Sequence, residues 1–416
     1  MPPLAPSPNP AQFPAMNPIL DTARFLADLH ELRQIGAFRT GVHRPTYSPE
    51  DMQSRSWLME RMAEAGLEPQ IDGIGNVLGR HPGPGPKLLV DSHIESQNEA
   101  GWLDGALGVV AGLALARAGL GVDVVAFADE EGHFDVGFAG SRSFVGDLTE
   151  AAIDGARSRN DGTPMRAALR AAGLEGQPRL ALEAGRYKGF YEMHIEQGTQ
   201  LEGAGLRLGV VTGIVAIWQW RITVVGSQDH AGGTTMAERR DAGLAAVRLL
   251  AAVDAEFPKL CGERTTWTTG SFTLHPGAPS IIPGRAEIQF QFRDLSMDVL
   301  NRLEAGLRAL VREAGRRERC VFTLEPVFKT LPTPCDPAMM KALREGAEAL
   351  APGAWREMPS GAGHDAQIVA GKIPASMLFV PSIGGVSHHW AENTSDADLA
   401  LGVATLHEAA RRFLAG

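Results

Sequence analysis

The spacing of apolar residues changes along the chain, and each change predicts a different element. Between about Asp21 and Gly66, apolar positions recur at helical spacing, which predicts two amphipathic helices around a loop. Helical spacing returns at Gly108 to Ala118. Between such stretches, short apolar runs bounded by turn residues predict strands at Lys87 to Val90, Val122 to Ala128, Gly189 to Met193 and Ser376 to Val380. This alternation indicates an α/β layer fold with a largely buried sheet.

The middle of the chain follows another pattern. Apolar and polar residues alternate from Ile217 to Val225, as in a half-exposed strand. The pattern then predicts, in order, a helix at Ala242–Glu256, strands near Trp267–Leu274 and Ala286–Arg293, a helix at Met297–Ala314 and a strand near Cys320–Val327. This βαββαβ order predicts a self-contained α+β insert between two parts of the α/β domain. Gly, Thr and Pro accumulate near 209–213 and 328–333, where we place the hinges.

Composition and charge exclude several classes of function. A chain of 416 residues exceeds one ordinary hydrophobic core, which favours two domains. The net charge of -10, without a basic cluster, argues against nucleic acid and anionic membranes as partners. Three cysteines are too few for a disulfide framework. The proline-studded start lacks a secretory signal, and no apolar run reaches the roughly 18 residues of a spanning helix. We therefore expect a cytoplasmic protein.

Potential metal ligands follow several predicted strands. Taken singly, each has an ordinary interpretation: a histidine at a strand end is usually hydrogen-bonded, Asp104 could cap a helix, and adjacent acids are usually solvated. Together they converge on one edge of the sheet, without cysteine, as sites for zinc, cobalt or manganese do. The candidate residues are His93, Asp104, Asp129, Glu130, Glu131, His194, Glu196, His388 and His389.

These segments resemble the hydantoinase/carbamoylase branch of the dinuclear-zinc M20 peptidase family. That branch includes N-carbamoyl-L-amino-acid hydrolases, β-ureidopropionases and allantoate amidohydrolases. The matching segments are GVHRPTYSPED, DGIGNVLGR, SHIES with LDGALGVVAG, ADEEG with GSRSFVGDL, MHIEQG, GVVTGI, DHAGGTTMAERRDA, SGAGHDA and SHHWAENT. The resemblance implies a metallopeptidase-like catalytic domain with a central mixed sheet flanked by helices, formed by 20–211 and 330–416. It further implies that 212–329 form a lid and dimerisation domain, and we interpret 1–19 as a flexible arm.

The resemblance also implies a set of metal ligands. His93 and His194 would bind one ion with Asp104, which bridges to a second ion held by Glu131 and His388. The expected cofactors are therefore two divalent metal ions, with zinc first and manganese, cobalt or nickel as alternatives. A bridging carboxylate can hold two cations at roughly 3.5–4 Å, and a water between them becomes acidic enough to attack at neutral pH.

The remaining roles concern proton transfer and the substrate. The resemblance makes Glu130 the general base, and it makes His230 an oxyanion donor that reaches across a homodimer interface. Arg293 would bind a substrate carboxylate. Gln197 and His364 would line the same pocket, although each also suits a purely structural role. The expected substrate-binding residues are Gln197, His230, Ser280, Arg293, Gly363 and His364.

The chain departs from the family pattern at several positions, which we expect to lie around the substrate. Glu95 stands where an aspartate would orient His93, and Ser280 replaces an asparagine that helps to hold the substrate. The loop GHFDVGFAGS after Glu131 lacks an expected arginine and is one residue short. Trp102 stands in place of a Gly-Gly pair.

Three functions remain open. The first is hydrolysis of a linear C–N bond in a small carboxylate-bearing compound of the N-carbamoyl-amino-acid type, which releases ammonia and carbon dioxide. The second is an N-acyl or N-formyl amino acid amidase, which releases a carboxylic acid instead, and Ser280 and the altered loops favour it. The third is a non-catalytic binding protein, which would have no reason to keep five ligand positions and a base.

Overall fold

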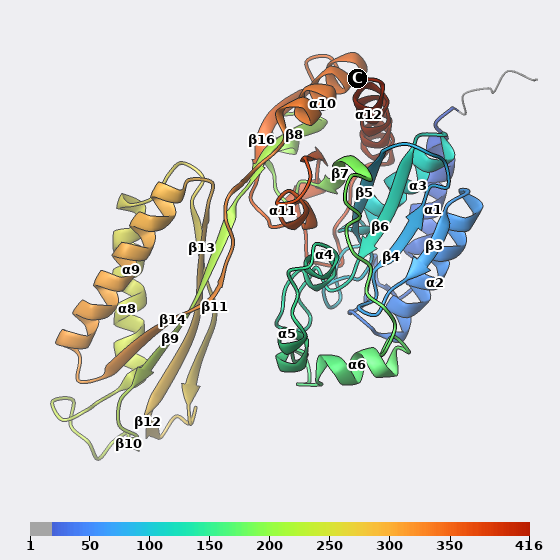
Figure 1. Cartoon of the computed structure of the whole chain (residues 1–416). Helices are drawn as coiled ribbons and strands as arrows, with labels where there is room; N and C mark the ends of the chain where they lie inside the picture. Colours follow the sequence, from blue (N-terminus) through green and yellow to red (C-terminus); the bar gives the residue numbers. More distant parts are fainter. Residues whose placement is uncertain (1–18) are drawn as a thin grey trace, which may run out of the picture.

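The computed structural model describes residues 19–416, so the predicted arm at 1–19 lies almost wholly outside the described residues. Figure 1 shows two bodies joined by long strands, the larger built around a nine-stranded mixed sheet. The strand order is β15-β8-β17-β7-β5-β6-β4-β3, with β16 paired to β8. These strands are β3 (Glu68–Ile71), β4 (Val77–Arg80), β5 (Lys87–His93), β6 (Val122–Phe127), β7 (Tyr187–Ile195), β8 (Leu208–Ile214), β15 (Thr333–Pro334), β16 (Trp355–Ser360) and β17 (Ala375–Val380).

Helices flank this sheet. Four of them lie in a row, since α1 contacts α3 and α12, and α12 contacts α10. The helices of this body are α1 (Thr22–Leu32), α2 (Pro49–Glu64), α3 (Ala106–Arg117), α4 (Ala139–Phe144), α5 (Glu150–Gly155), α6 (Met165–Ala171), α7 (Gln200–Gly203), α10 (Pro337–Leu350), α11 (Asp365–Val369) and α12 (Asp396–Ala415), with the 3-10 turn η2 (Ile383–Gly385). A two-stranded hairpin, β1 (Ala37–Phe38) with β2 (Gly41–Val42), precedes α2.

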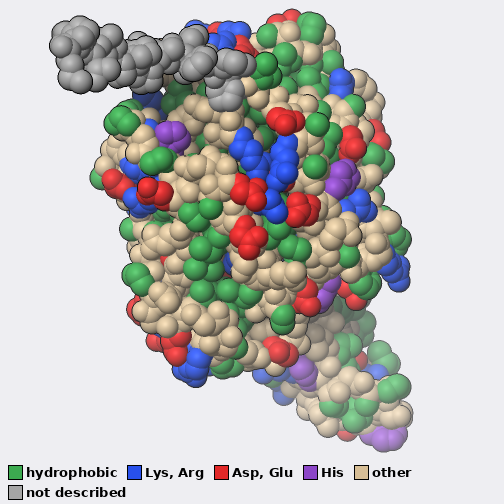
Figure 2. Space-filling model, turned by 90° about the vertical axis from the view of Figure 1, so that its right-hand side faces the viewer, with side chains coloured by type: hydrophobic (Ala, Val, Ile, Leu, Met, Phe, Trp, Pro, Cys, Tyr) green, Lys and Arg blue, Asp and Glu red, His purple; other side chains and the backbone are tan. Residues whose placement is uncertain are grey.

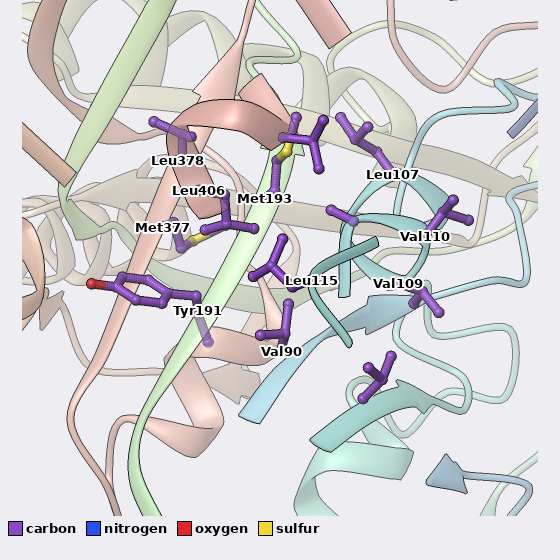
Figure 3. Packing of buried hydrophobic residues seen from close by; sticks show 14 of the residues in the cluster. Val90, Leu107, Val109, Val110, Leu115, Tyr191, Met193, Met377, Leu378 and Leu406 are labelled. Carbon is purple, nitrogen blue, oxygen red and sulfur yellow. The ribbon is translucent and has the colours of Figure 1, made fainter. Parts of the chain in front are cut away.

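Helix α3 is the central packing element, because every residue from Ala106 to Ala116 is buried. Its side chains pack among those of β5, β7, β17 and α12, as Figure 3 shows for Leu107, Leu115, Val90 and Leu406. The helix lies so close to the sheet that a Cβ on Gly108 would come within 2.5 Å of the Asp91 carbonyl oxygen. This close approach fixes where the residues just before the helix lie.

The smaller body is the predicted insert. Its sheet has the order β11-β13-β9-β14, and α8 and α9 pack on one face of it. Trp218, Trp220, Ile222 and Val224 of β9 face the helices, and the residues between them face away. The elements are β9 (Ala216–Val225), β10 (Asp229–His230), α8 (Ala242–Glu256), η1 (Phe257–Lys259), β11 (Thr266–His275), β12 (Ile281–Ile282), β13 (Arg285–Asp294), α9 (Met297–Arg317) and β14 (Val321–Lys329).

The predicted α/β fold with a central mixed sheet is confirmed. The longer elements of the insert follow the predicted βαββαβ order, and the two-residue strands β10 and β12 are additional. Each body has its own core, since the buried apolar residues of the insert run from Ala216 to Cys320 and form a separate cluster. The domain boundaries at 211/212 and 329/330, and the lid role, stay predictions. In the part of the chain that the structure describes, no helix is long and apolar enough to cross a membrane. On the face shown in Figure 2, acidic and basic side chains are interspersed.

Candidate metal centre and cleft

The predicted ligands meet at one edge of the large sheet. His93 ends β5, Glu130 and Glu131 follow β6, and His194 lies near the end of β7. Strands β6, β5 and β7 are parallel neighbours, so their carboxyl ends point to the same edge. Among the described residues, three groups of side chains have donor atoms close enough to hold an ion, and two of them share Asp104: His93, Asp104 and His194 in one, and Asp104, Glu131 and His388 in the other. The third group is Glu192, His194 and His364.

Asp104 belongs to two of these groups and divides its two oxygens between them. Its Oδ1 lies 3.0 Å from Nε2 of His194 and 3.7 Å from Nε2 of His93. Its Oδ2 lies 3.2 Å from Nε2 of His388, which is 3.6 Å from Oε2 of Glu131. Asp104 does not cap α3, because Gly105 occupies the cap position and no side chain bonds the helix start. The ordinary interpretation of Asp104 as a helix cap is therefore wrong.

The two buried histidines present the same nitrogen to Asp104. Nδ1 of His93 lies 3.1 Å from the Glu95 carbonyl oxygen, and Nδ1 of His194 lies 2.9 Å from that of Ile195. A carbonyl oxygen accepts a hydrogen bond from a protonated Nδ1, which leaves the Nε2 lone pair free for a metal ion. Gly105 has a φ of 68° and leaves room for the His93 ring, since a Cβ there would lie 2.5 Å from it.

Burial and neighbouring charges shift the pKa values of the carboxylates in the site. Burial raises the pKa of Glu131, and it raises the pKa of Glu130 well above its usual range. Burial opposes the charge of Asp104 as well, but hydrogen bonds from His194, His388 and His93 hold its pKa well below the usual range. Among the described residues, the ion-pair partners of these three carboxylates are histidines. Glu131 Oε1 is buried without a hydrogen-bond partner in residues 19–416. This nitrogen and oxygen donor set fits divalent cations.

Glu130 is held beside the two groups rather than within them. Its Oε2 lies 3.7 Å from Nε2 of His93, and its backbone N–H donates to Oε1 of Glu95 at 2.8 Å. Oε2 of Glu95 accepts from Nη2 of Arg55 at 2.9 Å, and Arg55 also binds Asp51 at 3.1 Å. The expected contact of the Glu95 carboxylate with His93 is long, since Oε1 lies 3.9 Å from Nδ1 of His93. The carbonyl oxygen of Glu95 orients His93 instead, and its side chain fixes the backbone of Glu130.

Several residues that sequence reasoning did not single out also position the centre. Glu392 is buried and accepts from the backbone N–H groups of Leu103 at 3.2 Å and Asp104 at 3.0 Å. Burial and the neighbouring Asp104 raise the pKa of Glu392 to about 8. Gln97 donates to Oε2 of Glu131 at 2.9 Å. Glu392 lies in the segment SHHWAENT that carries the resemblance, whereas no feature of the sequence marks Gln97.

Three strand-end candidates lie outside the centre. The carboxylate of Asp129 accepts from Thr46 Oγ1 and from the His133 backbone, and that of Glu196 accepts from the N–H groups at the start of α7. His389 is exposed, and its ring lies tilted against that of Trp390, with ring centroids 4.7 Å apart. His389 is hydrogen-bonded, as predicted for a histidine at a strand end, because it accepts from the Ala391 N–H group. Asp129 and Glu196 are buried and hydrogen-bonded rather than solvated.

A cleft of about 1840 Å³ lies between the centre and the insert. Asp104, Glu130, Glu131, His194 and His388 line it from the large body, and Arg293 lines it from β13. Nη1 of Arg293 donates to the Gly361 carbonyl oxygen at 3.1 Å, and no carboxylate within residues 19–416 pairs with the guanidinium. Burial lowers the pKa of Arg293. A half-buried, unpaired guanidinium is a suitable partner for a substrate carboxylate.

The predicted pocket residues divide into two sets. Gln197 Nε2 donates to Asp104 Oδ2 at 3.0 Å, and Gln197, Gly363 and His364 all line the cleft. His230 and Ser280 do not: they lie beside each other, where Ala231 N–H donates to the Ser280 carbonyl, and His230 is exposed. Figure 1 shows β10 and β12 at the tip of the insert, far from the large sheet. Within one chain, these two residues are not brought to the metal centre.

The departures from the family pattern also divide. Asp135, Val136, Gly137 and Phe138 of the shortened loop line the cleft, as expected. Trp102 does not, because it is buried, its ring stacks 5.1 Å from that of His30, and the Arg33 guanidinium lies 4.6 Å above it. The expectation that Trp102 lies beside the substrate is therefore wrong.

Comparison with known proteins gives consistent results. The family described as "Peptidase family M20/M25/M40" matches residues 86–412. The chain is 33% identical over 395 residues to an N-carbamoyl-L-amino acid amidohydrolase of Geobacillus stearothermophilus, with 91% of this chain and 95% of the relative covered. It is 35% identical over 384 residues to an allantoate amidohydrolase of Escherichia coli, with 88% and 91% covered. An amidase structure of the hydantoinase/carbamoylase family from Burkholderia phymatum has 43% identity, covers 96% of this chain and 99% of that chain, and gives a TM-score of 0.83.

Metal binding should release protons from His388. Although burial opposes its charge, contacts with Asp104 and Glu131 raise the pKa of His388 to about 9, so a metal ion must displace a proton at pH 7.5. The number of protons released on metal binding can be measured by calorimetric titration of the metal-free protein with Mn²⁺ in buffers of different ionisation enthalpy. We expect His388→Ala to release about one proton fewer than wild type. His389→Ala is the matched control and should resemble wild type. Equal proton release from wild type and His388→Ala would contradict this assignment.

The buried Arg55 should be essential for stability. Replacing it with Met leaves Asp51 and Glu95 buried without their counter-charge, which costs about 3–5 kcal/mol. Arg61 on the same helix pairs with exposed partners, so Arg61→Met should cost at most about 1 kcal/mol. Thermal unfolding followed by circular dichroism compares the two variants. Equal midpoints would show that Arg55 is not the buried counter-charge we describe.

Proposed function

The chain belongs to peptidase family M20/M25/M40, and we propose that it hydrolyses a linear C–N bond in a small carboxylate-bearing substrate, of the N-carbamoyl-amino-acid type. The observation that carries this proposal is the pair of ligand groups sharing Asp104, with Glu130 beside them and Arg293 unpaired in the same cleft. Relatives named N-carbamoyl-L-amino acid amidohydrolase and allantoate amidohydrolase support the same reaction class.

We propose two divalent ions as cofactors, with zinc first and manganese, cobalt or nickel as alternatives. His93, His194 and Asp104 would hold one ion, and Asp104, Glu131 and His388 the other. A carboxylate with one oxygen toward each group is suited to bridging, and imidazole with carboxylate is a donor set that these metals accept. When bound, such a pair of ions polarises the scissile carbonyl and makes an attacking water more acidic.

The residues of the chain supply binding and proton transfer. Arg293 would grip the substrate carboxylate and thereby fix the distance between that group and the scissile bond. Glu130, held through its N–H by Glu95, would take the proton of the attacking water and deliver it to the leaving nitrogen. Nearby cations would lower the pKa of Glu130 from the raised value that burial alone gives it, which leaves the carboxylate free to accept that proton.

For an N-carbamoyl amino acid, attack at the carbamoyl carbon releases the amino acid, and the carbamate decomposes to ammonia and carbon dioxide. The alternative is an N-acyl or N-formyl amidase, which releases the amine and a carboxylic acid without ammonia. Ser280 supports that alternative, because a hydroxyl cannot replace both the donor and the acceptor of an amide side chain. A non-catalytic binding protein has no use for an acid held beside two ligand groups.

We further propose a homodimer formed through the insert, so that His230 and Ser280 reach the cleft of the partner chain. Strand β11 is an edge strand, paired only with β13 in the described residues, and nearly all of it is exposed. Phe272 and Leu274 on β11 and Val247 on α8 are exposed apolar side chains. An unpaired edge with apolar side chains is suited to pairing with another chain. Pairing would also give a role to His230, which lies outside the cleft of its own chain.

We propose a cytoplasmic location. The three cysteines of the chain, Cys261, Cys320 and Cys335, are all free thiols, and Cys320 and Cys335 are buried. Free thiols are stable in a reducing compartment.

The reaction can be tested with a panel of N-carbamoyl-L-amino acids, 3-ureidopropionate and allantoate. We expect the metal-loaded enzyme to release ammonia from at least one of them. Glu130→Gln should keep its metal, measured by elemental analysis, and lose about 10²–10⁴-fold in kcat because proton transfer fails. The adjacent Glu131→Gln and Asp104→Ala should lose metal as well. Amine release without ammonia would favour the acyl amidase, and full activity of Glu130→Gln would refute the role of that residue.

The dimer can be tested by mixing inactive chains. His230→Ala exchanged with Glu130→Gln should recover about a quarter of wild-type activity, because half of the dimers are mixed and each has one intact site. Exchange of Glu130→Gln with Asp104→Ala, which damage the same side of the site, should recover none. A monomer by analytical ultracentrifugation, or no recovery in the first mixture, would contradict action across the interface.

A further inference from the structure

Five apolar residues form one wall of the cleft along the strands that join the two bodies. We call Phe138, Ile217, Val327, Phe328 and Leu331 the apolar wall; all five line the cleft. Phe138 comes from the large body and Phe328 from the insert, and their rings stack with centroids 6.4 Å apart. The wall therefore spans the junction of the two bodies.

The wall lies next to Arg293. Ile217 on β9 is the register partner of Arg293 on β13, so the two residues are neighbours across the sheet. Arg293 also bonds the carbonyl of Gly361, and a Cβ on Gly363 would lie 2.9 Å from Phe138 and 3.1 Å from Ile217. The guanidinium and the wall thus approach the same glycine turn.

Two residues of the wall are exposed to solvent. Val327 is 45% exposed and Leu331 67% exposed, although both are large and apolar. Phe138 has a φ of 54°, a left-handed conformation that is strained for a bulky side chain. Solvent-exposed hydrocarbon in a cleft is typical of a binding surface. A strained backbone conformation at an aromatic residue beside it is also typical of such sites.

From these observations we infer that the substrate is an N-carbamoyl or N-acyl α-amino acid with an apolar side chain, which packs against the apolar wall. The inference rests on the proposed function, and it names the substrate class of that same site. The carboxylate and the side chain of an α-amino acid are both bonded to the α-carbon. When the carboxylate binds Arg293, the side chain of the substrate must therefore lie close to the guanidinium, where the apolar wall begins.

The apolar wall favours substrates with apolar side chains, because it removes the hydrocarbon surface of these side chains from water. Each methylene that it covers stabilises binding and should raise kcat/KM about fourfold, the equivalent of ~0.8 kcal/mol. A polar side chain of similar size would lose hydrogen bonds to water without finding new partners on the wall. The wall thus disfavours aspartate, glutamine and allantoate derivatives.

The first test measures kcat/KM for the N-carbamoyl derivatives of glycine, L-alanine, L-2-aminobutyrate, L-norvaline and L-norleucine. We expect a rise of about fourfold per added methylene and a preference for norleucine over the similarly sized glutamine derivative. Calorimetric binding of the glycine and norleucine derivatives to metal-loaded Glu130→Gln gives an independent readout and should show the same order. Equal or better use of the glycine, glutamine or aspartate derivative, or of allantoate, would overturn the inference.

The second test locates the selectivity. Val327→Ala and Leu331→Ala should each lower kcat/KM for the norleucine derivative by about fourfold or more relative to that for the glycine derivative. Val321→Ala is the matched control, because Val321 lies on the same strand, is 58% exposed and does not line the cleft. It should change neither value. Variants that lower kcat/KM for all substrates by the same factor would also overturn the inference.

The N-acetyl derivatives of the same amino acids separate this inference from the proposed reaction. A rise with chain length in the N-acetyl series, without turnover of the N-carbamoyl series, would support the apolar wall and contradict the ureido reaction. Turnover of the carbamoyl series without a length dependence would support the reaction and contradict the wall. Turnover of neither series would count against both.

Discussion

Asp104 offers one carboxylate oxygen to His93 and His194 and the other to His388, and the rest of the site is arranged around this division. Three features hold it in place. The close packing of α3 against the sheet sets its position, the N–H groups at 103 and 104 bond Glu392, and Gly105 leaves space for the His93 ring. A shared carboxylate among imidazoles has a low pKa, so it remains an anion that can bridge two cations.

In the function that we propose, the metal ligands and Glu130 belong to the large body, whereas Arg293 and His230 belong to the insert. The large body supplies Glu130 and the ligands. His93, Glu131 and His194 lie at or just after strand ends, and Asp104 lies just before α3, which favours precise geometry. The insert supplies Arg293 on a strand of its own core, so the distance from the carboxylate site to the metal centre depends on how the two bodies meet. His230 and Ser280 lie at the far tip of the insert. His230 and Ser280 do not line the cleft of their own chain, and our proposal of a dimer rests on this observation.

Much of this arrangement could be predicted from the sequence, because parallel strands place their carboxyl ends at one edge. Apolar runs ending in His93, Glu131 and His194 therefore indicated a common site. The interactions that orient these residues could not be predicted, because they depend on register and on distant segments. Glu392 lies 288 residues from Asp104, and Arg55 reaches Glu95 from a helix that precedes the sheet. The sequence likewise could not distinguish Trp102, which packs on His30, from residues of the cleft.

Anomalous scattering from a crystal of the metal-loaded protein tests the sharing of Asp104 most directly. We predict two metal peaks, one bonded by His93, His194 and Asp104 Oδ1, and the other by Glu131, His388 and Asp104 Oδ2, with Glu130 bonded to neither. A single peak, or two peaks of which only one is bonded by Asp104, would contradict the account.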